Sequence, residues 1–335
     1  MLNRVVWKTN AFEPGQKVVR TTRIPNSDWE ERLFNDEAML EFMRRHFPPY
    51  LATAYERLHD GNGPARADIW RYAVLYKYGG VYADSDSGFE GSIKTFENDA
   101  WSKNSTMRLF NEHLALDPTH IKGHMPTLFE TLQGRWFVNP FAWQVQRAVG
   151  GPYAKPKLPP ALPANSLGNR FIVAEREHPV LLQTLFNIAT VLNDWDDERT
   201  RVALPFWARP LYFNDTYMPS VHARIVHITG PNMLTVTAWE TLNKLGPNDP
   251  CTGRPMLFVS DTPNGLAPGL RAAERGWRTL NTDASPTRKW KHYTKRDNGF
   301  PLLGDAKPAS AEREAEFHKW FTEEWKRITC KYKKH

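Results

Sequence analysis

The sequence predicts an α/β protein, because short apolar strands alternate along it with segments whose apolar residues recur at helical spacing. A first strand is expected at Val5 and Val6. The clearest unit runs from Arg66 to Asp86, where a helical pattern meets a glycine pair and then a short strand. In open α/β sheets, ligands bind beyond the carboxyl ends of the strands, so functional residues are expected there.

The segment between the first strand and this unit predicts two helices. Ser27-Asp28-Trp29-Glu30 resembles a capped helix start, since a side-chain oxygen there can accept bonds from free amide groups. The helical stripe then continues to His46 and ends at Pro48-Pro49, because proline cannot donate the next helix bond. A second helix is predicted from Leu51 to Leu58, with a loop at 60–64.

The central unit ends in two carboxylates. Four residues at i, i+3, i+4 and i+7 predict one apolar helix face: Ile69, Tyr72, Ala73 and Tyr76. Gly79-Gly80 ends this helix, and 81–83 follow as a strand. Asp84 and Asp86 are two apart, so on a continuing strand they would point to the same side. Such a pair can hold Mg²⁺ or Mn²⁺ through carboxylate oxygens.

Later parts of the chain show weaker patterns. Thr229-Gly230-Pro231-Asn232 is expected to be a turn after a strand, where glycine lets the backbone approach a phosphate. The C-terminal amphipathic segment favours packing on the protein body over docking on a membrane surface. The predicted strands are 107–110, 225–228 and 256–260, and the predicted helices are 178–189, 270–277 and 311–328.

Composition limits the classes of partner and the compartment. The balance of 44 Lys and Arg against 37 Asp and Glu gives a net charge of +7, which favours anionic partners such as nucleotide diphosphates, lipid surfaces or nucleic acid. Cys251 and Cys330 are too few for a disulfide framework and slightly favour a reducing compartment. Neither an apolar run of about 18 residues nor a signal-like N-terminus is seen. A cytoplasmic location is therefore expected, or the Golgi lumen if an anchor lies outside this chain.

The Asp84-x-Asp86 pair leaves more than one chemistry open. A metal held there could neutralise the charge on a departing nucleotide diphosphate. A calcium loop is excluded, because counting from Asp84 puts Gly88 and Thr95 where it needs an acid or amide and a glutamate. A phosphatase that uses Asp84 as its nucleophile stays an alternative. So does a carbohydrate- or nucleic-acid-binding module without catalysis.

A resemblance favours the first of these interpretations. The motifs that carry it are Ala67-Asp68, Arg71-Tyr72, Tyr78-Gly79-Gly80, Val81-Tyr82 and Asp84-Ser85-Asp86. This stretch of about twenty residues resembles the DXD-containing sugar transferases, a family that includes fungal initiating α-1,6-mannosyltransferases and vertebrate α-1,4-galactosyltransferases. It is more distantly similar to the glucosyltransferase domain of large clostridial toxins. Thr229-Gly230-Pro231 also resembles a later segment of the family.

The resemblance implies a fold and an activity. It implies a GT-A type fold, with a mixed central sheet flanked by helices and a C-terminal helical extension. We expect a catalytic domain over 1–305 and the amphipathic helix with its basic tail over 306–335. The implied reaction is retaining transfer from a UDP- or GDP-sugar to a hydroxyl of a glycan or other acceptor, with Mn²⁺ or Mg²⁺ and no nucleic-acid partner. Peripheral membrane contact through the C-terminal helix is a further expectation.

The resemblance also implies roles for particular residues. Those expected in catalysis are Asp68, Arg71 and Asp86. Those expected to bind the donor are Asp68, Arg71, Tyr82, Asp84, Ser85, Gly230 and Trp7. The metal ligands implied are Asp84, Asp86 and His292. Two positions depart from the family pattern: the string around Trp7 lacks the usual histidine, and His292 is not followed by the usual Gly-Ser-Trp.

Overall fold

The computed structural model describes residues 4–9, 20–23, 28–84, 87–89, 105–112, 166–193, 225, 228–260, 270–272 and 302–330 of the 335-residue chain. All structural statements below concern these ranges. Their main feature is a seven-stranded sheet in the order β2-β3-β1-β4-β7-β6-β8, beside a two-stranded sheet of β5 and β9.

The large sheet mixes parallel and antiparallel pairs, as predicted. Strand β1 lies between β3 and β4 and runs parallel to both, whereas β7 runs antiparallel to β4 and to β6. Strands β2 and β8 pair with β3 and β6. The bounds are β1 Val5–Thr9, β2 Arg20–Arg23, β3 Glu30–Phe34, β4 Gly80–Ala83, β5 Ser87–Phe89, β6 Met107–Glu112, β7 Ser166–Ala174, β8 Phe258–Ser260 and β9 Leu270–Ala272.

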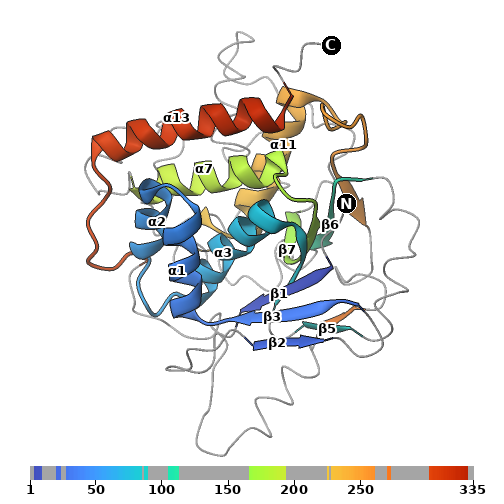
Figure 1. Ribbon diagram of the computed structural model, residues 1–335, viewed down its shortest axis with the longest axis horizontal. Helices are drawn as coiled ribbons and strands as arrows, with labels where there is room; N and C mark the ends of the chain where they lie inside the picture. Colours follow the sequence, from blue (N-terminus) through green and yellow to red (C-terminus); the bar gives the residue numbers. More distant parts are fainter. Residues whose placement is uncertain are drawn as a thin grey trace, which may run out of the picture.

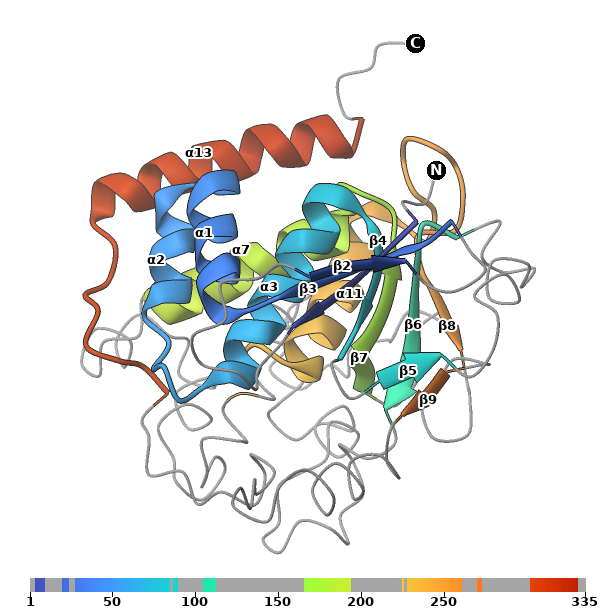
Figure 2. The ribbon, with the colours of Figure 1, turned by 60° about the horizontal axis from the view of Figure 1, so that its bottom comes forward.

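The helices form layers against this sheet (Figures 1 and 2). Helices α3 and α11 contact strands of the sheet, α7 packs against both of them, and α13 packs on α2 and α7 from the outside. The bounds are α1 Asp36–His46, α2 Pro49–Glu56, α3 Gly63–Tyr78, α7 Pro179–Asn193, α11 Pro231–Leu245 and α13 Ala311–Ile328.

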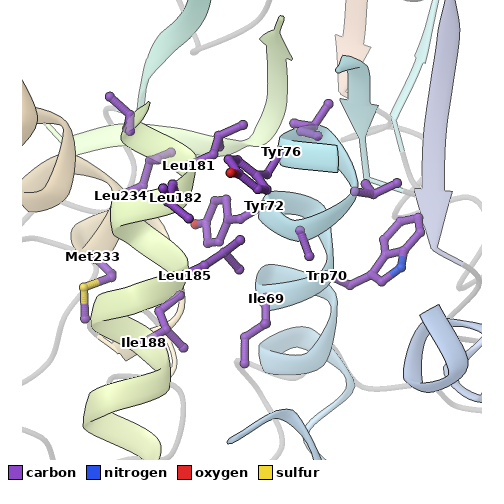
Figure 3. Close-up of a cluster of buried hydrophobic side chains, with 14 of the residues drawn as sticks. Ile69, Trp70, Tyr72, Tyr76, Leu181, Leu182, Leu185, Ile188, Met233 and Leu234 are labelled. Atoms are coloured by element: carbon purple, nitrogen blue, oxygen red, sulfur yellow. The ribbon is translucent and has the colours of Figure 1, made fainter. Parts of the chain in front are cut away.

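Helix α3 lies at the centre of the core. Figure 3 shows Tyr72 and Tyr76 pointing toward α7, while Trp70 lies on the opposite side of the helix. Every residue from Ala67 to Tyr76 is buried. The predicted helix is therefore present, but it is enclosed on all sides rather than along one apolar face. Two charged residues of this segment consequently lie in the protein interior.

The glycine pair after α3 has a steric reason. Gly79 has a φ of 66°, a conformation that L side chains rarely adopt. A Cβ at this position would lie 2.6 Å from the backbone nitrogen of Arg176. Gly79 therefore allows the chain to leave α3 against the β7–α7 turn and to enter β4 directly.

The prediction that a helix starts at Ser27–Glu30 is wrong. Glu30–Phe34 is strand β3, which pairs in parallel with β1, and α1 begins only at Asp36. The N-cap is Asn35, whose side chain accepts a bond from Ala38 N at 2.9 Å. Backbone pairing with β1 outweighs the local capping pattern, because it satisfies the peptide groups of a whole segment.

Two further predictions around the C-terminal half are corrected. Ile225 and Ile228 are helical rather than part of a strand, and the backbone N–H of Thr229 donates to Ile225 O at 3.0 Å. Leu270–Ala272 is strand β9 rather than the start of a helix. Strand β7 and helix α11 were not predicted, whereas the strands at 107–112 and 258–260 and the helix from 179 are confirmed.

The C-terminal helix α13 is present as predicted and packs on the protein body. Phe317 stacks on Tyr50 at 4.9 Å between ring centroids and on Phe186 at 5.5 Å. Cys251 and Cys330 form a disulfide at its C-terminal end, which the cysteine count had not predicted. The boundary between domains at 305 stays a prediction. Within the described part of the chain, no helix is long and apolar enough to cross a membrane.

Candidate functional site

The centre of the candidate site is the guanidinium of Arg71 on α3. Its Nη2 lies 2.9 Å from Asp68 Oδ1, one turn earlier on the same helix, and 3.2 Å from Asp84 Oδ1, just after β4. Nη1 donates to the backbone oxygen of Asn169 in β7 at 2.6 Å. Arg71 therefore joins two carboxylates that come from different elements, and it fixes both relative to the sheet.

Asp68 is held from three directions. Besides Arg71, the side-chain amide of Asn169 donates to Oδ1 at 2.9 Å, and the hydroxyl of Thr229 donates to Oδ2 at 2.9 Å. The amide of Asn169 also donates to the hydroxyl of Tyr72 at 3.0 Å. Since all these side chains are buried, each bond forms where water does not compete strongly.

The charge states follow from burial and from these partners. Burial raises the pKa of Asp68 to about 6, and Arg71 and the hydrogen bonds from Thr229 and Asn169 oppose the rise. Burial works against the charge of Arg71, yet Asp84, Tyr82 and Asp68 raise its pKa above the usual value. At neutral pH the group of two carboxylates and one guanidinium therefore has one net negative charge, which attracts a cation.

Asp84 is the most accessible member, with a side chain that is 32 % exposed. The hydroxyl of Tyr82 donates to Asp84 Oδ1 at 2.9 Å, the same oxygen that faces Arg71. Burial raises the pKa of Tyr82 well above its usual value, so the hydroxyl keeps its proton and can donate. The Arg71 guanidinium also lies over the Tyr82 ring, 4.5 Å from its centroid. Tyr82 and Arg71 together orient the Asp84 carboxylate.

Two other expected donor-binding residues occupy less open positions. Trp7 is buried, and its indole N–H donates to Gly79 O at 2.8 Å while its ring stacks on Tyr78. The N–H of Gly230 donates to Ile225 O at 2.9 Å, and its oxygen accepts from the Tyr72 hydroxyl at 3.3 Å. Their roles in donor binding stay predictions.

Three site predictions lie outside the described residues: Ser85, Asp86 and His292. In the described ranges there is no group of three or more His, Cys, Asp or Glu side chains that could hold a metal. Asp84 supplies one carboxylate of the oxygen type that Mg²⁺ and Mn²⁺ prefer. The described part of the site therefore supplies one ligand for a divalent cation, Asp84, and any further ligands would come from outside the described residues.

The sequence had not indicated Asn169, and it had indicated Thr229 only as part of a turn. Asn169 lies 101 residues from Asp68 and Thr229 lies 161 residues from it, so no local pattern reveals either contact. The only available signal was the Thr229-Gly230-Pro231 string itself. Both residues reach Asp68 because β7 and the chain before α11 lie beside α3.

The fold and this site define an α/β protein in which a buried arginine joins a buried carboxylate to a partly exposed one, next to the central strands. Residues 14–107 match the family described as "Glycosyltransferase sugar-binding region containing DXD motif". This match confirms the resemblance of residues 67–86 to the DXD-containing sugar transferases. The match includes Asp68, Arg71, Asp84 and Asp86.

Two relatives from Schizosaccharomyces pombe are similar over a short segment. Inositol phosphoceramide mannosyltransferase 3 is 39% identical over 83 residues, which cover 24% of this chain and 22% of that protein. Inositol phosphoceramide mannosyltransferase 2 is 37% identical over 83 residues, covering 24% and 23%. The similarity thus spans less than a quarter of each relative.

Solved structures show a weaker likeness. PaToxG glycosyltransferase has a TM-score of 0.33 and 10% identity, covering 88% of this chain and 65% of that chain. The UDP-bound glycosyltransferase domain from the YGT toxin has a TM-score of 0.30 and 14% identity, covering 68% and 52%. These scores are too low to establish a shared fold.

Proposed function

We propose that this chain is a metal-dependent glycosyltransferase that moves a sugar from a nucleotide-sugar donor to a hydroxyl of an acceptor. The observation that carries the proposal is the Arg71 guanidinium held between Asp68 and Asp84 inside the region that matches the sugar-binding family. In this group Asp68, which can accept a hydrogen bond from a sugar hydroxyl, lies beside Asp84, which can bind a cation.

Asp84 and Asp86 are the residues that would hold Mn²⁺ or Mg²⁺. Oδ1 of Asp84 accepts bonds from Arg71 and Tyr82, so Oδ2 is the oxygen that the carboxylate can offer to the cation. When bound, such a cation neutralises the charge that develops on a departing diphosphate. Tyr82 and Arg71 hold the carboxylate in place before any ligand arrives, which reduces the reorganisation needed during the reaction.

Asp68 is the residue proposed to bind the sugar. An ionised carboxylate can accept about four hydrogen bonds, and Asp68 accepts three from Arg71, Asn169 and Thr229. One acceptor position is left for a hydroxyl of the donor sugar. A sugar oriented in this way presents its reacting carbon in a constant geometry, and such positioning supplies a large part of the rate in transfer reactions.

Arg71 has a narrower proposed role than the sequence suggested. Four of its five N–H groups face Ala67 O, Asn169 O, Asp68 and Asp84. At most one N–H remains for a phosphate oxygen. Arg71 therefore acts mainly by positioning Asp68 and Asp84, and its charge adds to the stabilisation of the diphosphate.

The finer features of the reaction rest on the family resemblance. We include retention of the anomeric configuration, with the acceptor hydroxyl attacking from the face that the diphosphate leaves, and we assign no covalent nucleophile. Membrane contact through α13 is not included, because its aromatic side chains Phe317 and Phe321 contact α7 at Phe186.

A donor screen tests the proposed function. The protein is incubated with UDP- and GDP-sugars and Mn²⁺, and the released nucleoside diphosphate is measured. We expect release from one class of donor, loss of it with a chelator, and loss of it in Asp86→Asn. Release of orthophosphate from phosphomonoesters without nucleotide product would support the phosphatase instead. Binding of glycans without any turnover would support a binding module.

A further inference from the structure

Thr229 is a buried residue whose contact with the site is not explained by a turn. It lies immediately before Gly230 and Pro231, at the entry to α11, and none of its surface is exposed. Its hydroxyl lies 2.9 Å from Asp68 Oδ2. The Thr-Gly-Pro string therefore places a hydroxyl, rather than a glycine amide, against the central carboxylate of the site.

The direction of this hydrogen bond can be determined by counting donors. The Thr229 hydroxyl has one proton and two acceptors in reach, Asp68 Oδ2 at 2.9 Å and Ile225 O at 3.1 Å. Ile225 O already accepts the backbone N–H groups of Thr229 and Gly230, at 3.0 and 2.9 Å. Two bonds use both lone pairs of a carbonyl oxygen, and bonds to a charged acceptor are the stronger ones. The proton therefore goes to Asp68.

The bond determines where Asp68 can receive a ligand. Arg71 and Asn169 both bond to Oδ1, so Thr229 is the partner of Oδ2. Without Thr229, the carboxylate would have no donor on Oδ2 and would be held through Oδ1 alone. With Thr229 in place, the remaining acceptor direction on Oδ2 is defined.

The geometry points to Thr229 as a positioning residue, which fixes the Asp68 carboxylate so that one direction of Oδ2 accepts a hydroxyl of the donor sugar. This inference rests on the proposed function for the nature of the ligand, but the contact itself does not depend on it. It gives the segment before α11 a role in sugar orientation, which is separate from contact with a phosphate.

The contact makes a prediction about titration. The charged groups that act on Asp68 are Arg71 on α3 and Asp84, just after β4. Tyr72 on α3 and Tyr82 in β4 act on the neighbouring Arg71. A hydrogen bond to the ionised form of a carboxyl lowers its pKa, so removal of the Thr229 hydroxyl must raise the pKa of Asp68. A merely structural role for Thr229 would not change this titration.

The test compares Thr229→Val and Thr229→Ser with a matched control. Thr241→Val is that control, because Thr241 lies on α11, is equally buried and has a hydroxyl without a hydrogen-bond partner. The pKa of Asp68 is followed by carbon-13 NMR of aspartate carboxyls, with Asp68→Asn for assignment. We expect an upward shift of about one pH unit in Thr229→Val, near wild-type values in Thr229→Ser, and no shift in Thr241→Val.

Kinetics supply the second readout. We expect kcat/KM for the nucleotide sugar to fall about 10- to 100-fold in Thr229→Val, with its rise toward neutral pH displaced upward, and to recover in Thr229→Ser. If Thr229→Val does not fold, Thr229→Ala replaces it, because alanine puts no methyl group against the carboxylate. An unchanged Asp68 pKa with the same pH profile as Thr241→Val would overturn the inference.

The two failures can be distinguished. If wild-type protein turns over no nucleotide sugar while the Asp68 pKa still shifts in Thr229→Val, the proposed function fails and the role in sugar orientation fails with it. If turnover is present but the pKa does not shift, the proposed function stands and the role of Thr229 is wrong.

Discussion

Arg71 Nη2 lies 3.2 Å from Asp84 Oδ1, and this contact joins helix α3 to the carboxylate that follows strand β4. The same nitrogen bonds to Asp68, so one guanidinium sets the distance between the two acids. Because Asp68 and Arg71 are buried and the partners of Arg71 come from three elements, the group is organised before any ligand binds.

Removal of the Arg71 charge is expected to destabilise the fold as well as the site. Arg71→Gln would leave the buried Asp68 without its counter-ion, which costs about 3 to 5 kcal/mol. Urea unfolding measures this loss. The control is Arg44→Gln, which breaks an exposed pair with Glu56 and should cost less than about 1 kcal/mol. Equal losses in the two variants would contradict the structural role of Arg71.

Tyr82→Phe should weaken metal binding while leaving the fold intact. The variant keeps the ring under Arg71 but removes the hydroxyl that donates to Asp84 Oδ1. Loss of a group that orients a metal ligand commonly costs about 10- to 100-fold in metal affinity. Titration with Mn²⁺ in the presence of the nucleotide diphosphate checks this value.

The matched control for Tyr82→Phe is Tyr55→Phe. The Tyr55 hydroxyl is also buried but has no hydrogen-bond partner, so its removal should leave the Mn²⁺ affinity unchanged. The same Mn²⁺ affinity in both variants would show that Tyr82 does not orient Asp84.

His178 is expected to make the fold less stable in acid. Burial lowers its pKa to about 4. Its Nε2 lies 3.0 Å from Met256 O and its Nδ1 accepts from Val180 N, so the neutral ring is satisfied on both sides. Between the unfolded pKa of about 6.5 and about 4, the unfolded chain binds a proton that the folded chain does not. The neutral His178 ring therefore makes its full contribution to the free energy of unfolding above about pH 6.5. This contribution decreases by about 3 kcal/mol as the pH falls from about 6.5 to about 4.

Unfolding free energies of wild type and His178→Gln from pH 4 to 7.5 check this dependence. Other groups titrate in the same window, among them Glu240, whose pKa burial raises to about 7. Subtracting the unfolding free energy of His178→Gln from that of wild type at each pH removes the contribution of these other groups. If that difference does not change with pH, His178 is not the group responsible.

The disulfide between Cys251 and Cys330 should stabilise the chain. It closes a loop across a sequence separation of 79, for which the chain-entropy estimate is about 4.5 kcal/mol. Reduction should therefore lower the Tm of wild type and leave the Tm of a Cys251→Ala, Cys330→Ala double variant unchanged. Alkylation and mass spectrometry of the unreduced protein would contradict the bridge by finding two free thiols.

The parts of the fold that could be predicted from sequence depend on local chemistry. Helix α3, the stop at Gly79 and strand β4 follow from periodicity and from the conformational freedom of glycine. The region around Ser27 was predicted wrongly because its capping pattern is local, whereas the pairing of β3 with β1 joins segments about 25 residues apart.

The candidate site could be predicted only in part for the same reason. Asp68, Arg71, Tyr82 and Asp84 lie within one short segment, so a motif contains all four. Asn169 and Thr229 reach Asp68 from distant segments, and neither has a local pattern of its own. The cysteine pair was missed because a count of two gives no information about spatial proximity.

The most direct test of the proposed function is nucleoside diphosphate release from the preferred nucleotide sugar, measured for wild type, Asp84→Asn and Asp305→Asn with and without Mn²⁺. Asp305 is exposed and is not part of the site, so its variant serves as the control for an aspartate-to-asparagine change. The account predicts Mn²⁺-dependent release by wild type and Asp305→Asn and loss of at least 100-fold, on the order of 3 kcal/mol, in Asp84→Asn. Equal release by Asp84→Asn and wild type would contradict it.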